Sequence, residues 1–414
     1  MNRRLRIPII LVGTIVIVWA IFSAGFATGN VFAQRGLPPP GILAGALPDT
    51  PSQDTDDVDF GLFWEAWNIL QDNFHEGPLD PLVLREGAIS GLALATGDAN
   101  TIYQNAHDAK LAREHLSGTF EGVGIRVQLK DGLPFILQPL PGSPAERAGV
   151  QPNEFVLAVD GVSTEDLSMA DFGSLVRGPR GTIVVLTLRP EGGEQSRDVE
   201  IERDRIVVPS VSSRRIDEIG YLRINNFSSR TAGEVQAALE EFSDARIEGL
   251  VLDLRNNPGG FLNASVDVAN RFLPSGALIL TQESRGEPPR EFTARGGTKF
   301  TGPPMVLLVN QGTASASEIV AGALQAHGRA TLLGEETYGK GSVQKLHRLS
   351  DESLLRVTSG IWITPSGINL GANGLMPDEL IEPEDGQLGS DDDVVLQRAL
   401  DRLRGVLAAQ PVAA

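Results

Sequence analysis

The sequence predicts a multidomain chain of α/β and β class, with an amino-terminal apolar segment, a helical region, a β module and a βαβ core. Three observations carry this prediction. The chain has 414 residues, which is too long for one typical hydrophobic core and enough for two or three domains. Between residues 119 and 205 the apolar pattern has a period of two. After residue 205, strand-like and helix-like runs alternate.

The composition excludes several classes of function. The formal charge is -18, and no Lys/Arg cluster occurs after the first few residues, whereas a nucleic-acid binder needs a basic face. There is no cysteine, so disulfides, thiolate catalysis and cysteine zinc sites are excluded. The five histidines show neither metal-ligand spacing nor an HExxH motif. We therefore expect no nucleic-acid partner, no metal and no cofactor.

Residues 1–33 predict a membrane anchor or a signal segment. Three arginines precede an apolar run over residues 7–27, which is long enough to cross a bilayer as a helix. The basic flank favours a cytoplasmic start and an exported remainder. A signal peptide cleaved near Ala33 is the alternative, although such peptides usually have a shorter apolar run. The prediction is a single-pass protein of the cell membrane, with its domains in the periplasm or outside the cell.

The next two segments are a linker and a helical region. Residues 34–59 are rich in proline, glycine and acids, which is typical of an extended tether. In residues 60–118, Phe63, Trp67 and Leu70 recur at helical spacing and predict an apolar stripe. Glycine-containing pairs at residues 77–78 and 97–98 divide this region into short helices.

Residues 119–205 predict a compact β module of about the size of a PDZ domain. Short β-like runs such as GVGIRVQL, PFILQPL, FVLAVDG and TIVVLTLRP are separated by turn residues. Two helices are expected between the strands, over residues 144–148 and 168–176.

Residues 206–386 predict βαβ units around a mainly parallel sheet. The strand-like runs are IGYLRINNF, GLVLDLRNN and MVLLVNQG, and they alternate with the helical runs TAGEVQAALEEFSDA, ASVDVANRFL and SEIVAGALQAHG. A last amphipathic helix is expected over residues 391–408, within a carboxy-terminal segment of residues 387–414. Its three leading aspartates lie where acids favour the start of a helix.

Ser315 is the candidate nucleophile, at the junction between a buried strand and a helix. Two interpretations fit this position. Ser315 and Glu318 have the spacing of a capping box, in which the two side chains cap the helix reciprocally. A serine at a helix start also has backbone N–H groups beside it, and that of Ala316 would stabilise an oxyanion.

Lys340 is the candidate base. His327 is the only histidine near Ser315 in the sequence, but it lies about three helical turns away. Its position before Gly328 is typical of a residue at the end of a helix. Lys340 lies between two glycines, and burial would lower its pKa toward the neutral form that a base requires. A solvated turn lysine is the alternative. Gln344 shares a strand face with Lys340 and would hold its amine by a hydrogen bond.

The loop that contains Lys340 begins like a phosphate-binding P-loop but lacks the Ser or Thr of that motif, because Gly341 follows Lys340.

The motifs after residue 60 resemble those of the carboxy-terminal processing peptidases, also called tail-specific proteases. They are FEGVGI, DLRNNPGG, NQGTASASEIVAGAL, GEETYGKGSVQ and GLMPDELI, in this order. The resemblance implies a PDZ domain and a protease core of the crotonase or ClpP type. It also implies a Ser/Lys dyad, with Ser315 as nucleophile, Lys340 as general base and Gln344 orienting the lysine. A basic residue often found after TPSG in the family is replaced by Ile368.

The resemblance implies further site residues. The oxyanion hole would comprise the N–H of Ala316 and a glycine N–H of DLRNNPGG, with Gly260 favoured and Gly259 left open. The carboxylate loop of the PDZ domain would comprise Gly122, Val123, Gly124 and Ile125. Arg177 resembles the arginine that couples the PDZ domain to the active site in some members, although Arg180 lies close by.

The expected function is a serine endopeptidase that cleaves proteins near their carboxy terminus, with a PDZ domain that binds the substrate tail and gates activity. Its partners would be proteins with a free carboxy terminus and the membrane; a homo-oligomer and an adaptor protein both remain open. The alternative is a catalytically inactive PDZ-containing scaffold. Retention of Ser315, Lys340 and Gln344 argues against it, because a scaffold needs none of them.

Overall fold

The computed structural model describes residues 58–296, 300–371, 373–383, 388–390 and 392–409. The chain divides into two units, Met1–Asp80 and Pro81–Ala414. The predicted anchor and most of the linker lie outside the described residues, so these two assignments stay predictions. None of the described helices is long and apolar enough to cross a membrane.

The described part of the first unit contains one helix, α2 (Gly61–Asn73). Phe63, Trp64 and Trp67 contact one another near its start in edge-to-face and tilted arrangements, with ring centroids 5.2 to 6.0 Å apart. No residue of α2 is buried in the structure. The predicted helical spacing is therefore present, and the aromatic side chains are packed mainly against each other.

The second unit begins with α3 (Pro81–Leu94), β1 (Ile102–Gln104) and α4 (Ala106–Ser117). The helix breaks lie where glycine pairs predicted them. The strand β1 was not predicted. It is only three residues long and exists because it pairs antiparallel with β18 (Leu354–Ile363), about 250 residues later in the chain.

The β module folds around its own hydrophobic core, in which Ile136, Val156, Leu186 and Ile201 are among the buried members. Ser143 and Ser168 cap its two helices by accepting hydrogen bonds from backbone N–H groups at 3.2 Å. The elements are β2 (Thr119–Gly122), β3 (Ile125–Lys130), β4 (Leu133–Pro139), α5 (Pro144–Arg147), β5 (Glu154–Val159), β6 (Val162–Ser163), α6 (Met169–Val176), β7 (Ile183–Pro190), β8 (Arg197–Glu202) and β9 (Asp204–Val207).

A six-stranded sheet forms the centre of the core, as the alternating pattern predicted. Its strand order is β10-β11-β12-β15-β16-β19, and every pair is parallel except β10 with β11. The strands are β10 (Val211–Ile216), β11 (Ile219–Ile224), β12 (Gly249–Asp253), β15 (Met305–Val309), β16 (Thr331–Gly334) and β19 (Glu379–Leu380).

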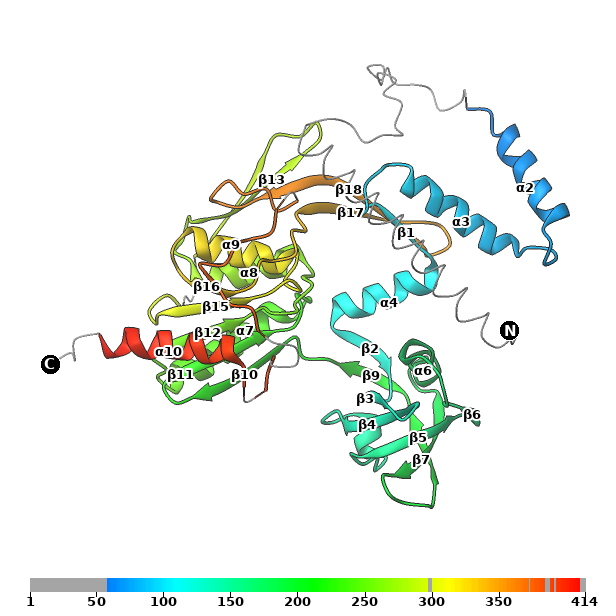
Figure 1. The fold of residues 1–414 in the computed structure, drawn as a ribbon, viewed down its shortest axis with the longest axis horizontal. Coiled ribbons are helices and arrows are strands. Elements are labelled where there is room, and N and C mark those ends of the chain that lie inside the picture. The colour runs from blue at the N-terminus through cyan, green and yellow to red at the C-terminus, as the bar shows by residue number, and fades with distance from the viewer. Residues whose placement is uncertain (1–57, 297–299, 372, 384–387, 391, 410–414) are drawn as a thin grey trace, which may run out of the picture. The chain divides into compact units, whose positions relative to one another are not determined.

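Helices cover both faces of this sheet. On one face, α7 (Thr231–Asp244), α8 (Leu262–Phe272) and α9 (Ala316–Ala326) pack against alternate residues of β11, β12, β15 and β16. On the other face, α10 (Val394–Ala408) packs against the intervening residues (Figure 1). Strands covered on both faces read as continuous apolar runs, which is why MVLLV and GLVLD were recognisable in the sequence.

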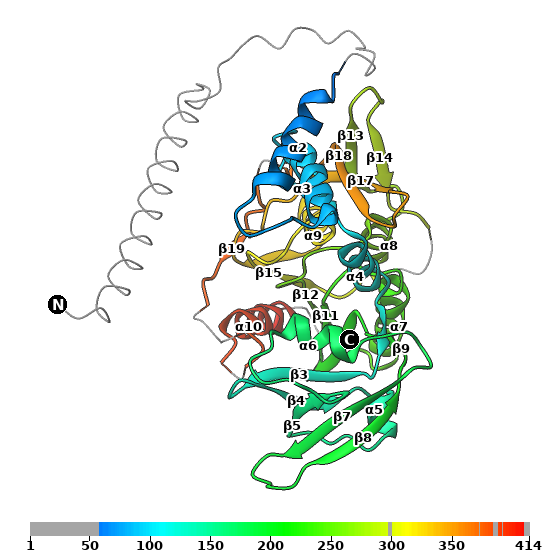
Figure 2. The same ribbon diagram turned by 90° about the vertical axis from the view of Figure 1, so that its right-hand side faces the viewer.

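A second, antiparallel sheet was not predicted. Strands β13 (Leu278–Ser284), β14 (Arg290–Thr293) and β17 (Ser342–Arg348) assemble with β1 and β18. Figure 2 labels four of them, β13, β14, β17 and β18. Strand β18 is its centre, because β17 pairs along one edge while β1 and β13 pair with different parts of the other. A bulge in β18 lies opposite the step between Val343 and Gln344.

A buried charge network ties α10 to the sheet. Arg255 is 2% exposed and donates to both oxygens of Asp393, the N-cap of α10, at 2.8 and 2.9 Å. It also donates to Asp253 at 2.7 Å, and Asp253 accepts from the Tyr221 hydroxyl. Burial by itself raises the pKa of Asp393, but the hydrogen bonds from Arg255, Gly389 and Leu396 outweigh it and hold this pKa below its usual range.

We expect Arg255→Met to destabilise the fold by about 3–5 kcal/mol, because it leaves the buried Asp393 without its cation and the buried Asp253 with the more distant Arg223, at 3.6 Å. The measurement is urea unfolding at neutral pH. Since the folded pKa of Asp393 is depressed, its contribution is present above its unfolded pKa and is lost as the pH falls through the folded one. The variant should therefore lose the part of the acid dependence of stability that Asp393 contributes.

The matched control is Arg404→Met, which removes an exposed ion pair to Asp217. An equal loss of stability in both variants would contradict the role given to the buried network.

Candidate active site

Three loops with candidate residues leave neighbouring parallel strands at the same edge of the sheet. The NNPGG loop follows β12, the loop with Ser315 follows β15, and the loop with Lys340 follows β16. The carboxyl ends of parallel strands meet at one edge, where open α/β sheets bind their ligands. The topology therefore brings together residues that are up to about eighty positions apart in the sequence.

Ser315 has an unusual backbone conformation. Its φ is 56° and its ψ is -116°, values that a non-glycine residue rarely adopts. It is the N-cap of α9, and the N–H of the next residue, Ala316, has no hydrogen-bond acceptor among the described residues. Strained backbone at a strand-to-helix turn is typical of a nucleophile, and the free N–H is available to a developing oxyanion.

Asn257 holds the loops after β12 and β15 against each other. It is buried, and its carbonyl accepts from the Ala314 N–H at 3.0 Å and from the Ser317 hydroxyl at 2.9 Å. Its side chain donates to the Ile224 carbonyl and accepts from the Gly259 N–H. The position of Ser315 is thus fixed by contacts from a different loop.

The two glycines of this loop have different hydrogen bonds. The Gly259 N–H donates to Asn257 at 2.9 Å, whereas the Gly260 N–H has no acceptor in the part of the chain that the structure describes. A Cβ on Gly259 would lie 2.9 Å from Ala316 N, so only glycine allows the loop to approach the helix start this closely. Gly260, rather than Gly259, therefore has the N–H that is free to contact a ligand.

Glu318 connects the loop of Ser315 to the loop of Lys340. Its side chain is completely buried. One carboxylate oxygen accepts from the backbone N–H of Ser315 at 2.7 Å and of Lys340 at 2.9 Å. The other accepts from the Thr337 hydroxyl at 2.6 Å and the Gly339 N–H at 2.8 Å. The capping-box interpretation is thus confirmed for Glu318, and the same carboxylate also holds the lysine loop.

Lys340 has the electrostatic environment that a neutral amine requires. Its side chain is half-buried, and this burial lowers its pKa, with a further contribution from the positive charge of Arg356. No hydrogen bond joins the Lys340 amine to the Ser315 hydroxyl in the described structure. Such bonds are often long in free enzymes and shorten when substrate binds.

Gln344 has a different partner from the one that its spacing predicted. Its amide donates to the backbone carbonyl of Asn100, just before β1, and no hydrogen bond to Lys340 is present in the described structure. Strand β17 begins only at Ser342, so Lys340 lies before it and the alternation assumed for residues 340, 342 and 344 does not extend to the lysine.

The predicted carboxylate loop lies between β2 and β3. The carbonyls of Val123 and Gly124 accept from Ala145 and Leu140 at 2.9 Å. Their N–H groups have no acceptor among the described residues, so they are available to an anion. Gly124 has a φ of 77°, and a Cβ there would lie 2.5 Å from that of Ser143, so this turn requires glycine.

Arg177 lies at the C-cap of α6 and contacts the segment that precedes the module. Its guanidinium lies 3.7 Å from Glu114 on α4 and 5.0 Å from the ring centre of Phe120 on β2. Arg180 instead pairs with Asp204 at 2.8 Å. Of the two arginines, Arg177 is therefore the one that links the module to α4.

His327 is excluded as a partner of Ser315. It lies at the C-cap of α9, and its ring contacts the Leu278 carbonyl at 2.7 Å. Gly328 follows with a φ of 61°, as expected for a glycine that ends a helix.

Comparison with known proteins identifies the family. Residues 218–381 match the sequence pattern of peptidase family S41, and residues 135–190 match a PDZ domain. The carboxyl-terminal-processing protease of Synechocystis is 40% identical over 302 residues, which are 70% of this chain and 70% of that protein. The chain belongs to peptidase family S41.

Other similarities agree with this assignment. The carboxy-terminal processing protease CtpA of Bacillus subtilis is 33% identical over 380 residues, which cover 91% of this S41 chain and 77% of the relative. The crystal structure of a putative S41 protease from Bacteroides fragilis has a TM-score of 0.54 at 17% identity and covers 83% and 97% of the two chains. The latter similarity concerns the fold alone. The protein is thus a serine-type peptidase with a PDZ domain and an S41 core.

Sequence reasoning missed two features of this S41 site. Glu318 was recognised as a helix cap, but its bonds to Thr337, Gly339 and Lys340 depend on a loop that returns from another strand. Arg356 gave no signal, because its effect on Lys340 requires β18 to lie beside β17.

We expect Glu318→Gln to reduce peptidase activity by roughly 100-fold, because the amide presents donors to backbone N–H groups and displaces both loops. A loss of stability of about 1–3 kcal/mol should accompany it, since a buried acceptor is lost. The measurements are kcat/KM and thermal unfolding.

Glu335→Gln is the matched control, since Glu335 lies in the loop of Lys340 and its side chain accepts from the Gln311 side chain alone among the described residues. It should retain wild-type activity. If Glu318→Gln were equally active, the carboxylate would not be positioning the site.

Proposed function

We propose that this S41 peptidase cleaves proteins near their carboxy terminus with Ser315 as nucleophile and Lys340 as general base. The observation that carries the proposal is the Glu318 carboxylate, which binds the backbone N–H of both residues. One rigid, buried acceptor thereby fixes the strained serine and the half-buried lysine relative to each other.

The proposed reaction follows from these groups. The neutral Lys340 amine takes the proton of the Ser315 hydroxyl as the oxygen attacks the scissile carbonyl carbon. The free N–H groups of Ala316 and Gly260 stabilise the oxyanion. The lysine then returns the proton to the leaving amine as the peptide bond breaks, which leaves an acyl-enzyme. Water, deprotonated by the same amine, hydrolyses the ester and regenerates the serine. Gln344 orients the lysine in this scheme once its bond to Asn100 is released.

The substrate class is a protein with an accessible carboxy-terminal tail. The names of the Synechocystis and Bacillus relatives describe carboxy-terminal processing, and the PDZ domain offers free N–H groups at Val123 and Gly124 for a terminal carboxylate. The predicted amino-terminal anchor supports a location at the cell membrane, with the peptidase outside the cytoplasm.

The PDZ domain is proposed to gate the site through the segment that precedes it. Arg177 contacts Glu114 on α4, and α4 directly follows β1. Asn100, just before β1, accepts the bond from Gln344. Tail binding that displaces α6 would therefore act on the partner of Gln344 through residues 100–117. A ligand shifts such a gate only by its affinity difference for the two states.

Ser315→Ala should abolish cleavage of a tailed protein, a loss of several orders of magnitude, because the nucleophile is absent. Its stability should change little, since the Glu318 cap bonds to the backbone of residue 315. Activity is measured by product formation, and labelling of wild type by a serine-directed reagent provides the positive control. An active alanine variant would disprove the assignment.

Lys340→Arg should be as inactive as Lys340→Ala, because a guanidinium stays protonated and accepts no proton. In the wild type, kcat/KM should rise with pH as the amine deprotonates. The rise should lie below the ordinary lysine value of 10.5, since burial and Arg356 both lower this pKa. Retention of more than about a tenth of the activity by the arginine variant would show that Lys340 is only an anchor.

A substrate with an amidated carboxy terminus should be cleaved less efficiently than its free acid, because the PDZ domain loses the terminal charge. Arg177→Ala should change the turnover of tailed proteins more than that of a short untailed peptide. Arg180→Ala, which removes only the pair with Asp204, is the matched control. Equal cleavage of acid and amide would rule out tail recognition, and an Arg177→Ala variant with unchanged turnover would rule out this route of gating.

A further inference from the structure

Arg356, on β18, has no charged partner in the part of the chain that the structure describes. It is half-buried, and its guanidinium makes no hydrogen bond and no ion pair with any residue that the structure describes. Its Nε is shielded from solvent and has no acceptor. Removal of a charge from water is costly unless an opposite charge compensates it. The surroundings of Arg356 therefore favour the binding of an anion.

The neighbours of Arg356 provide no counterion. It lies directly opposite Ile102 on β1 and Leu346 on β17, both apolar. Gln344 shares its sheet face, because directly paired residues face the same side and the strand period is two. On the adjoining segment, the Asp98 carboxylate accepts from the Thr101 hydroxyl at 2.7 Å and the Asn100 N–H at 3.1 Å and forms no ion pair.

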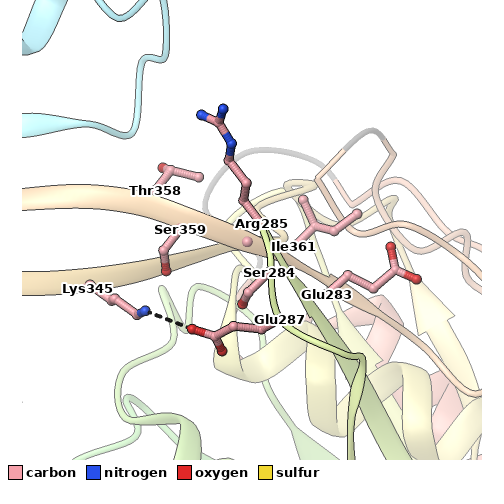
Figure 3. A pocket seen from close by; sticks show the side chains of 9 residues that line it. Glu283, Ser284, Arg285, Glu287, Lys345, Thr358, Ser359 and Ile361 are labelled. Atoms are coloured by element: carbon pink, nitrogen blue, oxygen red, sulfur yellow. Dashed lines mark hydrogen bonds and ion pairs between the residues drawn. The ribbon is translucent and has the colours of Figure 1, made fainter. Parts of the chain in front are cut away.

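A neighbouring pocket shows how charges are compensated elsewhere on this sheet. The pocket has a volume of about 550 Å³ and is lined by residues of β13, β17 and β18 (Figure 3). Its lysine, Lys345, pairs with Glu287 at 3.4 Å, and its arginine, Arg285, is exposed to water and points away from the other labelled side chains. Arg356 has no ion-pair partner among the described residues, and its Nε is shielded from water.

Arg356 also lies close enough to Lys340 to influence it. Its positive charge lowers the pKa of the lysine amine, an effect that weakens with distance. Gln344, four residues after Lys340, lies diagonally across from Arg356 on the same face. An anion bound by Arg356 would therefore lie beside the candidate base, where the substrate must pass.

We propose that Arg356 is a specificity-determining residue that binds a carboxylate of the peptide substrate next to Lys340. This inference rests on the proposed function and adds to it a preference for substrates with a carboxylate at this place. The carboxylate comes from an acidic side chain near the scissile bond or from the terminus of a short tail. A guanidinium suits this task, because its fork of donors matches both carboxylate oxygens.

The test uses the full chain and a set of quenched fluorescent peptides built on one cleaved sequence. Glutamate is moved through each position on both sides of the scissile bond, and each peptide has a glutamine twin. Every peptide is made with a free and with an amidated terminus. The measurement is kcat/KM, with KM and kcat reported separately, at a pH above the acid limb of the wild-type profile.

Wild type should prefer one glutamate peptide over its glutamine twin by about 10- to 100-fold, mostly in KM, as expected for a hydrogen-bonded charge pair. Arg356→Gln should abolish this preference, and Arg356→Lys should retain part of it. If Arg356→Gln instead loses the wild-type preference for the free acid over the amide, and glutamate has no effect at any position, then the carboxylate bound by Arg356 is that of the peptide terminus. Each preference is a ratio of kcat/KM for two matched peptides. Any effect of the lost charge on the pKa of Lys340 changes both values equally and therefore cancels.

Arg348→Gln is the matched control, because this exposed arginine of β17 pairs with Glu352 and should leave every ratio unchanged. Equal ratios in wild type and in folded Arg356→Gln, with folding checked by thermal unfolding, would overturn the inference while the peptidase function stands. A wild type that cleaves no peptide, or an active Ser315→Ala variant, would instead overturn the proposed function.

Discussion

A buried carboxylate is the constraint on which the candidate site depends. Glu318 is inaccessible to solvent and has no cationic partner among the described residues, yet its oxygens accept four hydrogen bonds. Charge-assisted bonds to backbone N–H groups are strong, and they hold the main chain rather than a mobile side chain. One group thus holds the backbone of Ser315 and the backbone of the lysine loop. A second buried residue, Asn257, joins the NNPGG loop to the loop of Ser315.

The parallel sheet determines which loops lie next to one another, which the polar contacts alone cannot do. It brings the ends of β12, β15 and β16 to one edge, and its two apolar faces are covered by α7–α9 and by α10. The fully buried pair of Arg255 with Asp393 fixes where α10 begins. Such a pair adds little stability relative to apolar residues, but it is costly to break, which favours a single arrangement of the helix. The site thus lies on rigid elements, and its loops are short.

The second sheet controls the environment of the lysine. Burial lowers the pKa of Lys340, and Arg356 of β18 adds a like charge, so two effects of the same sign favour the neutral amine. The same sheet includes β1, which places Asn100 at the amide of Gln344 and lies two residues before α4. Arg177 joins α4 to the PDZ domain. The second sheet therefore joins the strand of Arg356 to the segment that leads to the PDZ domain.

The sequence by itself determined the βαβ core, the β module, the helix breaks and the loops that carry Ser315, Lys340 and the two glycines. These features depend on local patterns: apolar periodicity, turn residues and the spacing of the Ser315 and Glu318 cap. Only the tertiary structure decided the rest. The short strand β1, the partner of Gln344, the free N–H of Gly260 rather than Gly259 and the uncompensated charge of Arg356 all follow from contacts between segments far apart in the chain. A local pattern contains no information on such pairings, because the register of β17 on β18, with its bulge, is set by the packing of the whole sheet.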